Sequence, residues 1–127
     1  TLAVKLPNVT AEATRDAMTA LLGALPEDKV KSVTPDRGTE FTLYREISKT
    51  LRGLPFYFAD PHSPWQRGTN ENTNGLIREF IPKGTDLAHV PADDVAHLVA
   101  LLNLRPRKCL DWRSPLEIFF NILLHLT

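Results

Sequence analysis

The chain has 127 residues, of which 43% are hydrophobic and 24% charged, a balance that fits one soluble globular domain or a large piece of one, with a second core not expected. Fifteen basic residues offset fifteen acidic ones, so the net charge of zero does not point to nucleic acid, and any basic surface has to be a local patch. A single cysteine excludes an internal disulfide framework, and without a signal peptide or a long apolar run the chain is expected in a bacterial-type cytoplasm, with no membrane partner.

Predicted strands and helices alternate over the first sixty residues. Apolar side chains at every second position predict a strand over residues 1–7. Helical spacing follows over residues 10–25, where Thr10 opens the segment and a glycine and a proline mark its end. Residues 29–36 indicate a short strand, residues 41–53 a second helix closed by a glycine, and residues 55–60 an aromatic strand.

The second half of the chain is predicted to be helical after a loop that begins at residue 61. Helices are expected over about residues 69–81 and over 91–104, where apolar residues form one stripe. A last helix over residues 114–126 is apolar nearly all round, so it should be buried within the fold or against a partner. Its apolar residues are Ile118, Phe119, Phe120, Ile122, Leu123, Leu124 and Leu126.

The order strand, helix, strand, helix, strand predicts an α/β sheet with right-handed crossovers and helices against its faces. Active groups in such sheets gather at the carboxyl ends of the strands. Asp36 follows one predicted strand and Asp60 ends another, and Asp60 is interpreted as a cap for the turn before Pro61. Glu40 is interpreted as the opening of the second helix, with an auxiliary ligand as the alternative.

The predicted helix after the loop carries several functional side chains on one face. If Thr69 caps this helix, Glu71 falls in the first turn, where the helix dipole favours an ionised carboxylate. Arg78 lies two turns later on almost the same face, with Asn74 and Gly75 between them. A glycine there weakens the helix by about 1 kcal/mol, which suggests the close approach of something such as a phosphate backbone.

Asp36 and Glu71 are candidates for one divalent-metal site. Mg²⁺ prefers oxygen ligands from one or two carboxylates, water and phosphate, and pairs of such ions serve phosphoryl transfer. The alternative interpretation is that both are ordinary surface charges. The histidines and Cys109 lack zinc-ligand spacing.

Three segments, "TPDRGTEF", "FADPHSPWQRGTNENTNGLIREFIPKGTDL" and "LNLRPRKCLDWRSPLEIF", together resemble transposases of the insertion-sequence-thirty family, within the retroviral-integrase and ribonuclease-H-like superfamily. The resemblance covers essentially the whole chain. It implies that Asp36 matches the second aspartate of the Asp-Asp-Glu metal triad and that Glu71 matches its glutamate. Arg78 matches a basic residue that is expected to contact transposon-end DNA.

The resemblance also implies a fold and a domain organisation. Residues 1–127 would form a partial integrase-type catalytic domain, with a ribonuclease-H-like α/β portion over 1–60, the catalytic loop and helices over 61–127, and the first strands missing. No counterpart of the first catalytic aspartate is found within the chain, so the fragment alone is expected to be inactive. Two smaller departures are Asp111, where the family usually has glycine, and a slightly longer interval between Asp36 and Glu71.

Further candidates surround the predicted catalytic helix. Arg67, Lys83 and Asn74 are expected to position DNA, and with "RPRK" at 105–108 the basic side chains would form the local basic surface; an ordinary solvated face is the alternative. Trp65 would either stack on an unpaired base or anchor the loop on the core.

The prediction from sequence is therefore the carboxyl-terminal part of a DNA transposase catalytic domain. The intact enzyme would use Mg²⁺ or Mn²⁺ to cleave transposon ends and join them to target DNA. A homo-oligomer is expected, through the apolar last helix or through swapped strands. The alternatives are a non-catalytic interaction or oligomerisation module and a related nuclease of the same superfamily.

Overall fold

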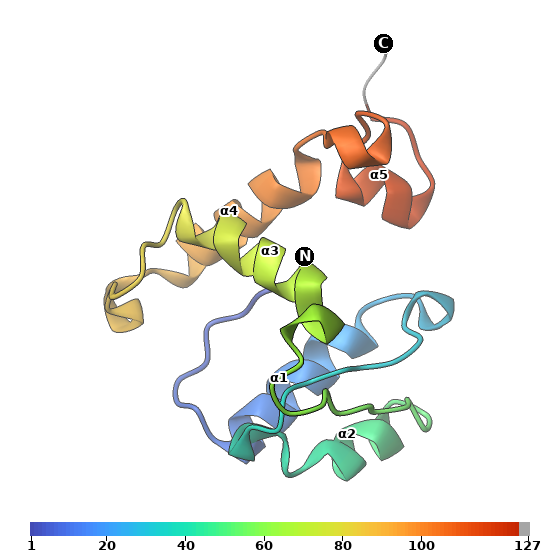
Figure 1. Cartoon of the computed structure of the whole chain (residues 1–127), viewed down its shortest axis with the longest axis vertical. Coiled ribbons are helices and arrows are strands. Elements are labelled where there is room, and N and C mark those ends of the chain that lie inside the picture. The colour runs from blue at the N-terminus through green and yellow to red at the C-terminus, as the bar shows by residue number, and fades with distance from the viewer. Residues whose placement is uncertain (125–127) are drawn as a thin grey trace. The chain divides into compact units, whose positions relative to one another are not determined.

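The computed structural model describes residues 1–124, and within this range the chain is built of helices joined by turns (Figure 1). No helix in this range is long and apolar enough to cross a membrane. The α-helices are α1 (Ala11–Gly23), α2 (Tyr44–Thr50), α3 (Gly68–Arg78), α4 (Ala92–Leu104) and α5 (Pro115–Phe120). The short 3₁₀ helices are η1 (Glu27–Lys29), η2 (Thr39–Phe41), η3 (Pro64–Arg67), η4 (Leu87–His89) and η5 (Lys108–Leu110).

The chain divides into two compact units. The amino-terminal unit contains residues 6–70, and the carboxyl-terminal unit contains residues 1–5 together with the chain from Glu71 onward. In the amino-terminal unit α1 packs on α2, and in the carboxyl-terminal unit α4 packs on α5. The border between the units falls inside α3.

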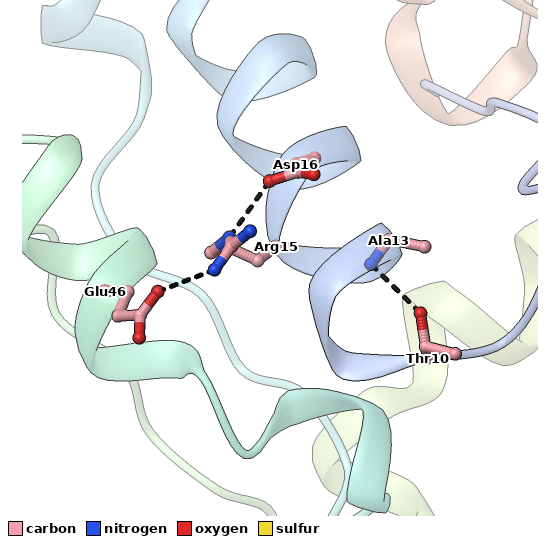
Figure 2. Close-up of polar contacts among 5 residues, drawn as sticks. All are labelled: Thr10, Ala13, Arg15, Asp16 and Glu46. Carbon is pink, nitrogen blue, oxygen red and sulfur yellow. Dashed lines mark hydrogen bonds and ion pairs between the residues drawn. The ribbon is translucent and has the colours of Figure 1, made fainter.

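Helix α1 begins where the sequence predicted. The Thr10 hydroxyl accepts a hydrogen bond from the Ala13 N–H at 3.2 Å and so satisfies a donor of the first turn (Figure 2). On the next turn the Arg15 guanidinium donates to Asp16 and to Glu46 of α2, each at 2.9 Å (Figure 2). The predicted helix is confirmed, and its arginine ties it to α2.

The core of the amino-terminal unit lies at the end of α2. Ile47 is 1% exposed and Leu54 is 6% exposed, which makes them the buried apolar residues of this unit within the described chain. The Gly53 N–H donates to the Ser48 carbonyl at 2.8 Å, while Arg52 and Gly53 both have positive φ angles. This is the six-to-one bond of a helix stop, so Gly53 closes the second helix as predicted.

The predicted sheet is wrong, because within residues 1–124 only one parallel bridge, Val33 to Phe56, joins two extended segments. The Val33 N–H donates to the Pro55 carbonyl and the Tyr57 N–H donates to the Val33 carbonyl, each at 2.9 Å. The next bond on either side of a parallel ladder needs the N–H of Pro35 or of Pro55, and proline has none. The two prolines therefore limit the ladder to one complete bridge, beyond which only the Ala59 N–H still donates to the Pro35 carbonyl at 3.3 Å.

The α/β ribonuclease-H-like fold class is contradicted along with the sheet. A pair of strands needs further neighbours and a buried face to be stable, and a single bridge supplies neither. Residues 1–7, which were predicted to be a strand, form no regular structure. They are held instead by the Lys5 ammonium, which donates to the carbonyls of Ala88 and Val90 at 3.0 Å each.

The carboxyl-terminal unit has its core on α4, where Leu98 is 5% exposed and Leu102 is 1% exposed. Both residues belong to the apolar stripe that the sequence predicted for residues 91–104. The Asn103 side chain on the same helix donates to the Thr1 carbonyl at 2.7 Å. Helix α4 therefore carries the buried core of this unit and also binds the first residue of the chain.

Helix α5 begins at a buried capping box. The Ser114 hydroxyl accepts from the Glu117 N–H at 3.3 Å, and the Glu117 carboxylate accepts from the Ser114 N–H at 2.7 Å. The same carboxylate accepts from the Leu124 N–H at 2.8 Å, which turns the following chain back toward the helix. Asn121, with φ of +52°, ends the helix at Phe120, six residues before the predicted end at residue 126.

The predicted burial of the last helix is only partly found. Glu117 is buried, but most apolar side chains of this segment are at least 40% exposed. These are Ile118, Phe120, Ile122, Leu123 and Leu124. The prediction for Leu126 concerns a position outside the described residues.

Candidate functional site

Asp36 lies at the end of the extended segment that follows Val33, and both of its oxygens are engaged. Its Oδ1 accepts from the Gly38 N–H at 3.0 Å, and its Oδ2 accepts from Nη1 of Arg67 at 3.1 Å. The side chain of Asp36 is 54% exposed and that of Arg67 is 28% exposed. A carboxylate is thus open to solvent on one side and faces a fixed positive charge on the other.

The loop that carries Arg67 is fastened at its base. The Gln66 side chain accepts from the Asp60 N–H at 2.8 Å and donates to the Asp60 carboxylate at 3.0 Å. The loop is also tied to the Asp36 segment, because the Ala59 N–H donates to the Pro35 carbonyl at 3.3 Å. Asp60 therefore closes the loop through Gln66, which the sequence reading did not single out.

An open pocket of about 420 Å³ lies between these two segments of the amino-terminal unit. Its wall mixes positive and negative side chains with prolines. The residues that line it are Asp36, Arg37, Ala59, Asp60, Pro61, His62, Ser63, Pro64 and Arg67. Because Asp36 pairs with Arg67 and Asp60 with Gln66, the pocket already holds a hydrogen-bond partner for each of its carboxylates.

Glu71 lies in the first turn of α3, as predicted, and is exposed. The helix begins at Gly68 instead of Thr69, because η3 runs directly into it, so Thr69 is part of the helix and does not cap it. The Glu71 carboxylate has no hydrogen bond or ion pair within residues 1–124. Asp36 and Glu71 fall in different compact units.

Most of the residues that were predicted to contact DNA are exposed to solvent and are not buried in the core. Asn74, Arg78 and Lys83 are exposed, and a side chain added at Gly75 would meet no atom within 4 Å. Trp65 is 75% exposed, so it does not anchor the loop on the core. Arg67 differs from the others because its guanidinium is engaged by Asp36.

Glu40, the possible auxiliary ligand, opens the second helical region within η2. Its carboxylate lies against Gly38, so close that a Cβ at Gly38 would clash with it. The amide of Gly38 donates to Asp36, so the two acidic side chains flank one glycine. Across residues 1–124, no three or more His, Cys, Asp or Glu side chains are grouped so that they could hold a metal ion.

A scan of the chain against protein-family models finds no match. Named relatives are found by direct comparison. The chain is 43% identical over 126 residues, or 99% of its length, to the transposase for insertion sequence element IS1086 of Cupriavidus metallidurans. It is 44% identical over 118 residues to the transposase InsI for insertion sequence element IS30A of Escherichia coli, and 44% identical over 94 residues to the transposase for IS4351 of Bacteroides fragilis.

By sequence, the chain belongs to the insertion-sequence-thirty family of transposases. This confirms the resemblance that its motifs indicated. The matched regions cover 93% of the chain for the Escherichia coli relative and 74% for the Bacteroides relative. The chain spans only 37%, 30% and 28% of the lengths of the three relatives.

The family resemblance implies a divalent metal, but within residues 1–124 Asp36 belongs to no group of three or more potential metal ligands. Its own carboxylate oxygens are hard donors of the kind that Mg²⁺ or Mn²⁺ prefers. The Arg67 guanidinium donates to Oδ2 of this carboxylate at 3.1 Å. The two residues are 31 positions apart, so the periodicity of the sequence does not reveal this contact.

Proposed function

We propose that this transposase segment supplies two metal-binding carboxylates, Asp36 and Glu71, and part of the DNA-binding surface of a DNA transposase. The observation that carries the proposal is the 43% identity over 99% of the chain to a named transposase. The exposure of both carboxylates supports it, since a ligand that waits for metal and phosphate has to be reachable.

In this proposal Mg²⁺ or Mn²⁺, when bound, supplies the Lewis-acid chemistry that activates water for cleaving a transposon end and the freed 3′-hydroxyl for attack on target DNA. Asp36 and Glu71 each contribute oxygen ligands. Arg78 and Lys83, which are exposed, bind phosphates, and Asn74 donates to the DNA backbone beside Gly75.

Trp65 has a separate role in the proposal. Its ring is 75% exposed, and an aromatic ring with a free face stacks on unpaired bases with little sequence preference. Arg67 and Arg37 line the pocket beside this loop and provide positive charge there. This arrangement suits a single-stranded DNA segment at a cleaved transposon end.

The 127-residue chain alone is proposed to be inactive. In the family pattern three carboxylates hold the metal, and residues 1–127 match two of them. Because one of the three ligands is missing, the chain should bind metal more weakly and should position the nucleophile less well.

The experiment that tests the function is a graft. The region of the Cupriavidus IS1086 transposase that matches this chain is replaced by residues 1–127, and cleavage of that element's ends is measured with Mn²⁺. We expect cleavage that is lost in Asp36→Asn and in Glu71→Gln, by about a hundredfold or more. Glu79→Gln is the matched control, because it removes a carboxylate that lies just beyond α3 and has not been assigned to metal. In the structure Glu79 forms a 3.9 Å ion pair with Arg105. An active graft that tolerates both carboxylate changes would refute the proposal.

A second candidate function is an interaction module that associates through its carboxyl-terminal apolar residues. The observation that favours it is the exposure of five apolar side chains, of which Leu123 is 74% exposed. Such a module would associate equally well when Asp36 and Glu71 are both alanine. Sedimentation of the double variant beside the unchanged chain separates the two candidates, since the transposase proposal does not require association of this segment alone.

A further inference from the structure

One exposed face of α4 is apolar in its middle and oppositely charged at its two ends. Asp94 lies in the first turn of the helix, and Arg105 follows its last residue, about three turns later on the same face. Leu98 and Leu101 lie between them, and Leu101 is 43% exposed. The helix therefore presents a stripe that begins with a carboxylate, continues over leucines and ends with a guanidinium.

Two open pockets lie along this stripe, both within the carboxyl-terminal unit. Asp94 and Leu98 line the first, which has a volume of about 330 Å³, and Arg105 lines the second, of about 320 Å³. Phe80, which is 50% exposed, and Leu101 line both pockets and therefore lie between them. A raised apolar pair between two hollows is the kind of surface into which the side chains of another helix pack.

The order of these residues is symmetric along the helix. Asp94 lies one turn before Leu98, and Arg105 lies one turn after Leu101. When a second α4 is laid against the first in the opposite direction, its Arg105 comes opposite Asp94 and its Leu101 comes opposite Leu98. Each of these pairings occurs twice, as a two-fold axis requires. The face is therefore self-complementary in both its charges and its apolar side chains.

We propose that this face binds a second copy of the chain, with the two α4 helices antiparallel across a two-fold axis. Leu101 of each copy enters the first pocket of the other copy, and Asp94 of each copy pairs with Arg105 of the other. The proposal requires no metal ion. It also uses a different surface from the apolar residues 118–124, through which the interaction module considered above would associate.

The charges favour a second copy over an unrelated apolar partner. Asp94 is exposed, and its carboxylate has no hydrogen bond or ion pair within residues 1–124. Arg105 is 62% exposed and reaches Glu79 only at 3.9 Å, so its guanidinium is available to another carboxylate. Antiparallel helices also bring the positive end of one helix dipole near the negative end of the other. An apolar patch alone would accept many partners, whereas opposite charges at its two ends select this one.

Charge reversal tests the pairing directly. In a dimer of Asp94→Arg two arginines face each other at both ends of the interface, and in a dimer of Arg105→Asp two aspartates do. Each variant should therefore raise the dissociation constant of its own dimer by about tenfold or more. When the two variants are mixed, every arginine faces an aspartate. The mixture should then form a heterodimer although neither variant pairs with itself.

The matched controls carry the same changes of charge away from this face. Asp93→Arg reverses a carboxylate in the same first turn of α4, about 100° around the helix from Asp94. Lys108→Asp reverses an exposed lysine in η5, outside the helix. Each control should change the dissociation constant less than about twofold, because charges beyond the contact are screened. Mixing the two controls should bring no gain over either one alone.

The experiment is sedimentation equilibrium of the 127-residue chain and its variants over about 10–500 μM, a range that suits the weak association expected of a small interface. Circular dichroism confirms that each variant is folded. We expect a reversible equilibrium of monomer and dimer in the unchanged chain. This equilibrium should be weakened in each of the two reversals on the face and restored in their mixture.

A chain that stays monomeric over this range overturns the proposal, and so does assembly that continues beyond a dimer. A dimer that the two reversals leave unchanged also overturns it and would place association on another surface, such as residues 118–124. Folded reversal variants that fail to associate when mixed, or controls that associate equally well, contradict the pairing of charges. None of these outcomes bears on the proposed function, which the graft tests through Asp36 and Glu71.

Discussion

The capping box of α5 gives a direct test of how this chain stabilises its helices. Ser114 is 0% exposed, and its hydroxyl accepts from the Glu117 N–H at 3.3 Å. Ser114→Ala removes this acceptor and leaves a buried N–H that water cannot reach. Loss of a cap typically costs about 0.5–2 kcal/mol, and burial places this one at about 2 kcal/mol.

Thr10 is the matched control, since its hydroxyl accepts from the Ala13 N–H at 3.2 Å but the residue is exposed. Thr10→Ala should cost only about 0.5–1 kcal/mol, because water replaces the lost acceptor. Urea denaturation followed by circular dichroism measures both free energies of unfolding. The reasoning is refuted if Ser114→Ala costs no more than Thr10→Ala.

Three further predictions follow from other parts of the structure. Asp111 has a φ of +52°, the region that glycine adopts freely, so Asp111→Ala should lower the free energy of unfolding by about 1 kcal/mol while Asp111→Gly leaves it unchanged or raises it, as thermal denaturation would show. Pro35→Ala restores an N–H that can donate to the Tyr57 carbonyl, so the new amide should be protected in hydrogen exchange, and rapid exchange there would contradict the account of the interrupted strands. Trp65→Ala should weaken binding of single-stranded DNA by about 1–3 kcal/mol in a fluorescence-anisotropy titration, whereas Trp112→Ala, which removes a ring that is 68% exposed, should leave it unchanged.

The helices could be predicted from sequence because their signals are local. Thr10 caps α1 within three residues of its partner, and the stripe that contains Leu98 and Leu102 repeats on one helix. Positions of helix ends were less certain. The sequence does not show that η3 continues into α3, or that Asn121 stops α5 after six residues.

The sheet could not be judged from strand patterns alone, because strand pairing is set by partners far along the chain. Val33 and Phe56 do meet in parallel, as the order of elements suggested. However, Pro35 and Pro55 both fall at positions where the ladder needs an N–H donor. The missing N–H donors can be recognised only when the register of the two segments is known.

The backbone conformation at Asp111 bears on a departure noted in the sequence. The family resemblance implies a glycine here, and the backbone of this residue is left-handed. Aspartate is one of the few residues with a side chain that tolerates this conformation at modest cost. The substitution is therefore compatible with the turn before α5.

The candidate site was only partly accessible to sequence reasoning. Asp36 and Glu71 followed from motifs, and Arg67 was assigned to DNA. The pairing of Arg67 with Asp36 and the closure of the loop by Gln66 depend on contacts between separate segments. No short-range pattern encodes those contacts.

The most direct test of the central claim is to locate a bound cation by Fe²⁺-generated hydroxyl-radical cleavage of the grafted transposase, read out by mass spectrometry. We predict backbone cuts beside both Asp36 and Glu71, suppressed by Mg²⁺ and lost in Asp36→Asn together with Glu71→Gln. Cuts that avoid both carboxylates, or that persist in the double variant, would contradict the account.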